Sequence, residues 1–315
     1  MAHYTRLDGR EIRGILAQFG IHNISAFELL SGGSENTNYL VKSKKGKFVL
    51  CIFEQKTGSN AKELAHLLKH LEINRFNTSK LIYTTNNESV IIWKDKPIII
   101  KAFIEGKIIK DLPPHLLKSI GKELAKLHQI SAPEYLPKQL NYGKEQFSLV
   151  KKYAPNSEFD IWLNNILEYI TPYLNLDLPK SLIHSDVFWD NVIIGEDGKT
   201  ATIIDFEEAA NYYRVFDIGM TIIGICGEGK IVNLDRAKHL LDGYQSEVQL
   251  LEDEINSLKA FTIYAGASMT FWRHQNFNYV KPDPNMFNHY LGLKVLVDDI
   301  IKQPDDCFVE LLKNS

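Results

Sequence analysis

Four polar side chains, His184, Asp186, Asn191 and Asp205, stand around two short apolar segments in the middle of the chain. The pattern His-x-Asp-x-x-x-x-Asn, followed by an apolar strand that ends in Asp-Phe, is typical of kinase-type phosphotransferases. There the first aspartate accepts the proton of the substrate hydroxyl, and the asparagine and second aspartate hold the metal on the nucleotide phosphates. The alternative interpretation is that these residues are ordinary polar groups around a turn. Their joint spacing favours phosphoryl-transfer chemistry.

A hairpin is expected to position this group. Residues 192–194 and 202–204 are short apolar strands. An Asp-Gly pair at 197–198 predicts a two-residue turn, because these residues readily take positive φ values. Folding about that turn places Asn191 opposite Asp205, to within about one residue of register. Carboxylate and amide oxygens that meet in this way suit a hard cation such as Mg²⁺.

Length and composition limit the class of protein. The 315 residues are 44% hydrophobic, which is enough for one large or two modest domains. A net charge of −3 predicts neither a nucleic-acid nor a membrane partner. Cys51, Cys226 and Cys307 form no pair motif, which is typical of reduced thiols. The N-terminus has no apolar core and residues 215–226 are too short to span a bilayer, so we expect a cytoplasmic protein.

The first hundred residues predict a small β-rich unit that follows a short helix at 8–20. A glycine-bearing loop separates its first two strands and could lie over phosphates, because glycine lets backbone N–H groups approach an anion. Such glycines are also common in ordinary hairpin turns. The phosphate-binding interpretation is favoured because a phosphoryl-transfer motif follows at residues 184–205. The expected strands are 26–30, 37–42, 48–54, 89–93 and 97–103, with a helix at 60–71. The loop residues that would cover phosphates are Gly32, Gly33, Ser34, Glu35 and Asn36.

The third strand lacks a residue that kinases usually carry. Cys51 stands where a lysine would contact the α- and β-phosphates. Lys47, Lys56 and Lys101 are nearby in sequence, but each fits a solvated surface lysine better.

A change of pattern near residue 105 predicts where the β-rich unit ends. The segment from Phe103 to Glu105 could offer its backbone to an adenine edge. Beyond it, helical periodicity dominates. We therefore expect an α+β protein with a nucleotide-binding lobe at 1–105 and a catalytic and substrate-binding lobe at 106–315. The expected helices include 113–130, 159–173, 235–244, 252–275 and 286–303.

Three arginines, Arg214, Arg236 and Arg273, occur in the second half of the chain. If the substrate has a carboxylate, one of them is expected to bind it through two hydrogen bonds. His128 is expected to be structural. Asp217 either caps the helix that it opens or braces the catalytic loop.

Three stretches resemble a known family. They are Gly-Ser-Glu-Asn-Thr-Asn-Tyr at 33–39, Phe-Val-Leu-Cys-Ile-Phe-Glu at 48–54, and the loop at 184–191 with Ile-Asp-Phe at 204–206. Together they resemble the aminoglycoside phosphotransferase and choline kinase superfamily, a branch of the protein-kinase-like fold. Within it the chain is similar to type II homoserine kinases, whose third strand also lacks the lysine. The resemblance covers nearly the whole chain.

The resemblance implies a bilobal kinase-like fold, ATP and Mg²⁺ as cofactors, and a small amino-alcohol substrate. The first choice is L-homoserine, giving the O-phospho-L-homoserine of threonine biosynthesis. In this interpretation Asp186 is the proton acceptor, and Asn191 and Asp205 hold the metal. Residues 32–36 cover the phosphates and 103–106 hold adenine. The substrate carboxylate would be bound by Arg273 or Arg214, and its ammonium by Glu207 or Glu208.

Other interpretations remain open. Glu207 and Glu208 are more typical of kinases for amino alcohols and amino sugars, so choline, ethanolamine, hydroxylysine or an aminoglycoside is the alternative substrate. Cys51 leaves a silent nucleotide-binding scaffold as a third interpretation. A protein kinase is disfavoured because no glycine follows Phe206. The sequence gives no oligomeric state.

Overall fold

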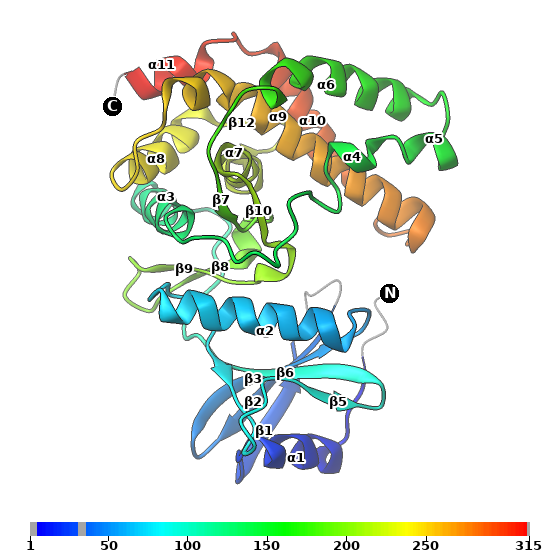
Figure 1. The fold of residues 1–315 in the computed structure, drawn as a ribbon, viewed down its shortest axis with the longest axis vertical. Coiled ribbons are helices and arrows are strands. Elements are labelled where there is room, and N and C mark those ends of the chain that lie inside the picture. The colour runs from blue at the N-terminus through cyan, green and yellow to red at the C-terminus, as the bar shows by residue number, and fades with distance from the viewer. Residues whose placement is uncertain (1–4, 31–35, 314–315) are drawn as a thin grey trace. The chain divides into compact units, whose positions relative to one another are not determined.

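The computed structural model describes residues 5–30 and 36–313. The chain forms two compact units, Met1–Glu105 and Gly106–Ser315. An antiparallel sheet builds the first unit and helices dominate the second (Figure 1). The predicted α+β class is therefore confirmed.

The first unit contains a six-stranded antiparallel sheet in the order β1-β2-β3-β6-β4, with β5 paired to β6. Asp8 begins helix α1 through a capping box, because its carboxylate accepts the N–H of Glu11, whose side chain accepts the N–H of Asp8. The elements are α1 Gly9–Gln18, β1 Ile24–Leu29, β2 Asn36–Ser43, β3 Gly46–Phe53, α2 Gly58–Ile73, β4 Leu81–Ile82, β5 Ile91–Trp93 and β6 Lys96–Ala102.

Alternation along the strands builds the core of this unit. Phe48, Leu50 and Ile52 of β3 are all buried on one face, in a cluster with Ile12 and Leu16 of α1. The period of two places every second side chain on the same side of the sheet. Helix α2 packs against β6.

The second unit is built around the 24-residue helix α9, which contacts α6, α7, α10 and α11 (Figure 1). Three short β-ribbons, β7–β10, β8–β9 and β11–β12, accompany the helices. The elements are α3 Pro114–His128, α4 Lys144–Phe147, α5 Val150–Tyr153, α6 Glu158–Leu174, β7 Lys180–Ile183, η1 Trp189–Asn191, β8 Val192–Ile194, β9 Ala201–Ile203, η2 Phe206–Glu208, β10 Ala210–Tyr213, α7 Arg214–Ile225, β11 Gly227–Glu228, β12 Ile231–Val232, α8 Leu234–Gln245, α9 Glu252–Gln275, η3 Asn276–Val280, α10 His289–Lys302 and α11 Cys307–Lys313.

Two glycines let α3 and α8 touch through their backbones. A Cβ atom at Gly121 would lie 2.0 Å from the carbonyl oxygen of Leu240, and one at Gly243 would lie 2.1 Å from that of Lys118. No larger residue fits at either position without moving a helix.

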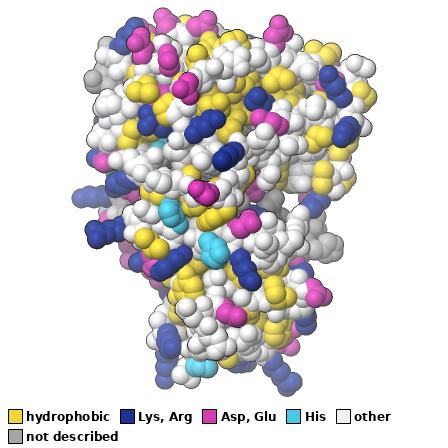
Figure 2. Space-filling model, viewed as in Figure 1, with side chains coloured by type: hydrophobic (Ala, Val, Ile, Leu, Met, Phe, Trp, Pro, Cys, Tyr) yellow, Lys and Arg dark blue, Asp and Glu magenta, His cyan; other side chains and the backbone are white. Residues whose placement is uncertain are grey.

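Charged side chains of both signs are interspersed on the face of the helical unit that Figure 2 shows, with hydrophobic side chains between them. Within the described part of the chain, no helix is both long and apolar enough to cross a membrane.

Candidate functional site

The loop that carries Asp186 follows strand β7, which is paired with β10. Asp217 in the first turn of α7 braces this loop, and its carboxylate is fully buried. It accepts hydrogen bonds from the backbone N–H of His184 at 2.8 Å and of Ser185 at 2.6 Å. Of the two roles considered for Asp217, the structure therefore shows the brace.

A second buried histidine supports Asp217 from helix α3. The Nε2 atom of His128 lies 3.0 Å from Asp217 Oδ2, and its Nδ1 atom lies 2.9 Å from the Tyr244 hydroxyl. His128 is therefore structural, as predicted, and it supports Asp217, which in turn binds the loop that carries Asp186.

His184 connects the loop to strand β9. Its Nε2 donates to the carbonyl of Ile204 at 2.8 Å, so Nδ1 carries the lone pair that accepts the N–H of Asp186 at 3.2 Å. The ring stands edge-on to Phe206, with centroids 4.7 Å apart. Burial lowers the pKa of His184 below 6.5, so the imidazole is neutral near pH 7.

The predicted hairpin is β8–β9, with Val192 opposite Ile203. The N–H of Ile204 donates to the carbonyl of Asn191 at 3.0 Å, so Asn191 and Asp205 end the hairpin within one residue of each other. The predicted register is therefore confirmed.

The predicted turn type is wrong. Residues 196–199 all lie outside the paired strands, and of the 197–198 pair only Gly198 has a positive φ, +65°. The carboxylate of Asp197 instead accepts the N–H groups of Lys199 and Thr200. This local capping stabilises a longer turn than the Asp-Gly pair suggested.

Asn191 and Asp205 offer a donor set that fits a magnesium ion. The Asn191 amide donates from Nδ2 to the carbonyl of Asp186 at 2.9 Å, which leaves the amide oxygen for an ion. Asp205 has a left-handed backbone with φ +71°. No cluster of three His, Cys, Asp or Glu side chains suited to a metal occurs within residues 5–30 and 36–313. One carboxylate with an amide is nevertheless enough for Mg²⁺, which usually takes its other ligands from phosphates and water.

Negative charge accumulates around Asp186. Burial raises the pKa of its carboxyl well above 3.8, and the charges of Asp205 and Glu208 raise it further. Asp190 acts in the same direction and Arg273 acts against it. The site therefore favours cations, or a proton on Asp186.

Arg273, near the end of α9, has a half-buried guanidinium that no carboxylate pairs within 4.0 Å among the residues described. Its Cζ lies 5.4 Å from the centroid of the Phe188 ring, and its Nη1 lies 3.5 Å from His289 Nε2. Burial lowers the pKa of Arg273, whereas the charge of Asp186 raises it. A guanidinium in this setting has the chemistry to bind an anion.

Arg214 has a different role from the one considered for it. Its Nε and Nη2 atoms donate to the two oxygens of Glu254 at 2.6 and 2.5 Å, and Glu254 is fully buried. The third arginine, Arg236, donates to the backbone carbonyls of Leu112 and Ile225. Of the two arginines proposed for the substrate, Arg214 is thus occupied by a structural pair.

The two glutamates that follow Phe206 lie in the 3-10 turn η2. The Glu208 carbonyl accepts the Ser185 hydroxyl at 2.6 Å, and the charge of Glu208 raises the pKa of Asp186. Glu207 is half-buried in the same turn. Tyr142 also contacts this region, through Ser185, and sequence reasoning missed it because it lies 43 residues away.

The predicted nucleotide contacts belong to the first unit. Gly32, Gly33, Ser34 and Glu35 lie outside the described residues, and Asn36 is the buried first residue of β2. The Phe103 N–H donates to the carbonyl of Lys47, whose ammonium pairs with Glu105 at 2.8 Å. Cys51 is 1% exposed between Asn38 and Ile99 of the neighbouring strands. The position of the missing lysine is therefore filled by a buried side chain.

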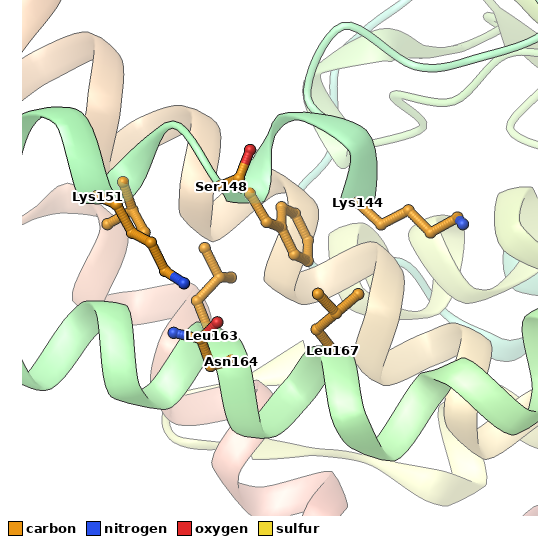
Figure 3. Close-up of a pocket in the computed structure, with 8 residues that line it drawn as sticks. Lys144, Ser148, Lys151, Leu163, Asn164 and Leu167 are labelled. Atoms are coloured by element: carbon orange, nitrogen blue, oxygen red, sulfur yellow. The ribbon is translucent and has the colours of Figure 1, made fainter. Parts of the chain in front are cut away.

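A cavity of about 140 Å³ lies between α4–α5 and α6 (Figure 3). Lys144 and Lys151 stand on opposite sides of it, over Leu163 and Leu167. None of the predicted site residues lines this cavity.

A comparison with protein families identifies this chain as a phosphotransferase. The family model described as "Phosphotransferase enzyme family" matches residues 26–247, and the chain belongs to this family. The predicted superfamily and enzyme class are thereby confirmed.

Two of the relatives to which the chain is similar are homoserine kinases. The chain is 27% identical over 283 residues to a homoserine kinase of Caulobacter vibrioides, covering 86% of this chain and 88% of the relative. It is 25% identical over 282 residues to a homoserine kinase of Agrobacterium fabrum, with 86% of each chain covered.

Solved structures show the same fold. An amicoumacin kinase in complex with AMP-PNP and Ca²⁺ matches with a TM-score of 0.73 at 16% identity, over 95% of both chains. A microcompartment-associated aminopropanol kinase matches with a TM-score of 0.71 at 15% identity, over 98% of both chains. At identities this low, the similarity shows the fold alone.

Proposed function

We propose that this phosphotransferase moves the γ-phosphate of ATP to the hydroxyl of L-homoserine, giving O-phospho-L-homoserine and ADP. Kinases of this family use ATP, and the curated relatives above are homoserine kinases. The choice of an amino-acid acceptor rests on one arginine.

Arg273 is the observation that carries the proposal. A half-buried guanidinium costs solvation free energy, and proteins usually offset that cost with a carboxylate. Here the direct neighbours are an aromatic ring and a neutral imidazole, while Asp186 acts on it only as a nearby charge. A substrate carboxylate would complete the pair. Choline, ethanolamine and aminoglycosides have no carboxylate to offer.

The ammonium of an amino acid needs negative charge close to the same place. Glu208 acts electrostatically on Asp186, and Glu207 lies in the same turn. We propose that Glu208 binds the ammonium group and that Glu207 is its neighbour in the same turn. Arginine and glutamate would then bind the two charges of the acceptor and leave its hydroxyl toward Asp186.

The reaction follows from the properties of Asp186. As the hydroxyl oxygen bonds to the γ-phosphorus, the bond from that phosphorus to the bridging oxygen breaks and ADP leaves. The hydroxyl proton passes to the Asp186 carboxylate, whose raised pKa favours accepting it. Asn191 and Asp205 would hold Mg²⁺, which supplies positive charge to the phosphates when bound. We further propose that residues 32–36 cover the phosphates of the nucleotide and that residues 103–106 hold its adenine.

Turnover of Mg·ATP, measured by coupled ADP release, tests the proposal. The acceptor panel is L-homoserine, L-serine, choline, ethanolamine, 5-hydroxylysine and an aminoglycoside, with Asp186→Asn as the inactive control. ADP release that depends on homoserine and is lost in the control supports the proposal. Turnover with carboxylate-free amines alone overturns the choice of substrate, and leaves the phosphotransferase assignment in place.

A further inference from the structure

Ser185, the residue before Asp186, has an unusual environment. It takes the left-handed conformation with φ +68°, which a residue with a side chain adopts only when its surroundings impose it. Its N–H donates to Asp217, and its hydroxyl donates to the carbonyl of Glu208 at 2.6 Å. The loop that carries Asp186 is thereby joined to the turn that carries Glu208.

Tyr142 completes this connection from outside both segments. Its hydroxyl lies 2.7 Å from the carbonyl oxygen of Ser185 and 2.8 Å from the Ser185 Oγ. The Tyr142 side chain is buried, and burial together with the charges of Asp186 and Glu208 raises the pKa of its phenol well above 10. The phenol therefore stays protonated and acts as a permanent donor to Ser185.

Every polar group of Ser185 is thus engaged, and each bond fixes a different part of the site. Asp217 fixes the start of the loop, Tyr142 fixes the carbonyl, and the Ser185 hydroxyl ties the loop to Glu208. Removing the phenol hydroxyl would leave the Ser185 carbonyl without the hydrogen bond from Tyr142, inside a strained turn. The turn could then relax, and the spacing between Asp186 and Glu208 would become variable.

We propose that Tyr142 is a positioning residue that sets the distance from the proton acceptor Asp186 to the ammonium-binding Glu208. The enzyme would then select acceptors by the number of carbon atoms between their hydroxyl and ammonium groups. This inference rests on the proposed function, because it takes Glu208 as the ammonium partner. Tyr142 touches neither substrate nor nucleotide in this proposal and acts through Ser185.

The test compares three acceptors that differ by one methylene each: L-serine, L-homoserine and L-5-hydroxynorvaline. For each, kcat and KM are measured on the full-length enzyme with Tyr142→Phe, which keeps the ring and removes only the hydroxyl. Tyr213→Phe is the matched control, because its hydroxyl also donates to a backbone carbonyl, that of Leu174, away from the site. Ser185→Ala is the second variant, which removes the link to Glu208 and keeps a Cβ at the same backbone conformation.

Tyr142→Phe is expected to lower kcat for L-homoserine by about ten-fold, the effect of one buried hydrogen bond. It should also reduce the preference for homoserine over its two homologues by a similar factor, and Ser185→Ala should do the same. Equal losses for all three acceptors, or a preference that stays at the wild-type value in both variants, would overturn the inference.

Failure of the proposed function gives a different result. If the wild-type enzyme phosphorylates carboxylate-free amines and not homoserine, the substrate proposal fails at the first measurement. The same variants are then compared on ethanolamine, 3-amino-1-propanol and 4-amino-1-butanol. If the variants discriminate less than the wild type among these three amines, control of the spacing by Tyr142 is still supported. If the variants discriminate as strongly as the wild type, the inference is overturned.

Discussion

The imidazole of His184 donates to the backbone carbonyl of Ile204 across 20 residues of sequence, at 2.8 Å. Its other nitrogen accepts the N–H of Asp186. One neutral ring therefore orients the loop of the proposed proton acceptor and the strand that leads to the proposed metal ligand Asp205.

Replacing His184 by phenylalanine keeps the bulk of the side chain and removes both hydrogen bonds. We expect kcat to fall by about 10²-fold, measured as ADP release, with the helical signal in circular dichroism retained. A variant with wild-type kcat would contradict this role.

Asp186 itself is expected to matter far more for turnover than for nucleotide binding. Asp186→Asn keeps the shape of the side chain and removes the base, so kcat should fall by about 10³-fold or more. ATP affinity, measured by calorimetric titration, should stay within a few-fold of the wild-type value. Near-full activity in this variant would rule out general-base catalysis by Asp186.

Arg273 and Arg214 form a matched pair of tests. Arg273→Gln should raise KM for homoserine by about 10²-fold, since an ion pair that has two hydrogen bonds is lost, and should leave the unfolding temperature nearly unchanged. Arg214→Met should act in the opposite way. It leaves buried Glu254 unpaired, which should lower the free energy of unfolding by about 3 kcal/mol, while KM for homoserine is retained. The reverse pattern would show that the two arginines are wrongly assigned.

The brace at Asp217 is expected to support both stability and activity. Asp217→Ala strips a buried acceptor from two backbone N–H groups and from His128, so the free energy of unfolding should fall by about 3 kcal/mol or more. Asp235→Ala, in the exposed first turn of α8, is the control and should change it by less than about 1 kcal/mol. Urea unfolding of both variants measures the difference. Equal stability of the two would show that the brace contributes little.

Stability is expected to fall on acidification below pH 6.5. Burial lowers the pKa of His274 from 6.5 to about 4. The unfolded chain therefore binds a proton at this residue first, so His274 does not change the free energy of unfolding above pH 6.5. It should lower that free energy by up to about 1.4 kcal/mol per pH unit as the pH falls toward 4.

His274→Phe tests this pH dependence at one position. The His274 ring is stacked on Phe159 with centroids 3.8 Å apart, so a phenylalanine should fit the same place. Thermal unfolding between pH 4 and 7 should then show a weaker loss of stability toward acid than in the wild type. An identical pH dependence would mean that His274 does not titrate in this range.

The parts of the site that are close in sequence could be predicted from it. His184, Asn191 and Asp205 belong to one loop and one hairpin, and two apolar strands fix their register. The turn type was wrong because Asp197 caps backbone N–H groups through its side chain, which competes with the conformation that an Asp-Gly pair favours.

The long-range contacts could not be predicted. Tyr142 reaches Ser185 across 43 residues, and Arg214 reaches Glu254 across 40. Neither pairing leaves a periodic or motif-like pattern in the sequence. A tyrosine in a loop and an arginine at the start of a helix are each compatible with many partners, and tertiary packing decides among them.

Asp205 shows when the site acquires its shape. Its φ of +71° lies in a region that a free aspartate seldom visits, and the chain on either side, strand β9 and the turn η2, holds it there. The unfavourable backbone energy of this residue is therefore a cost of folding. If Asp205 holds the metal as proposed, its backbone would not have to change on binding, and no free energy of rearrangement would be subtracted from the affinity.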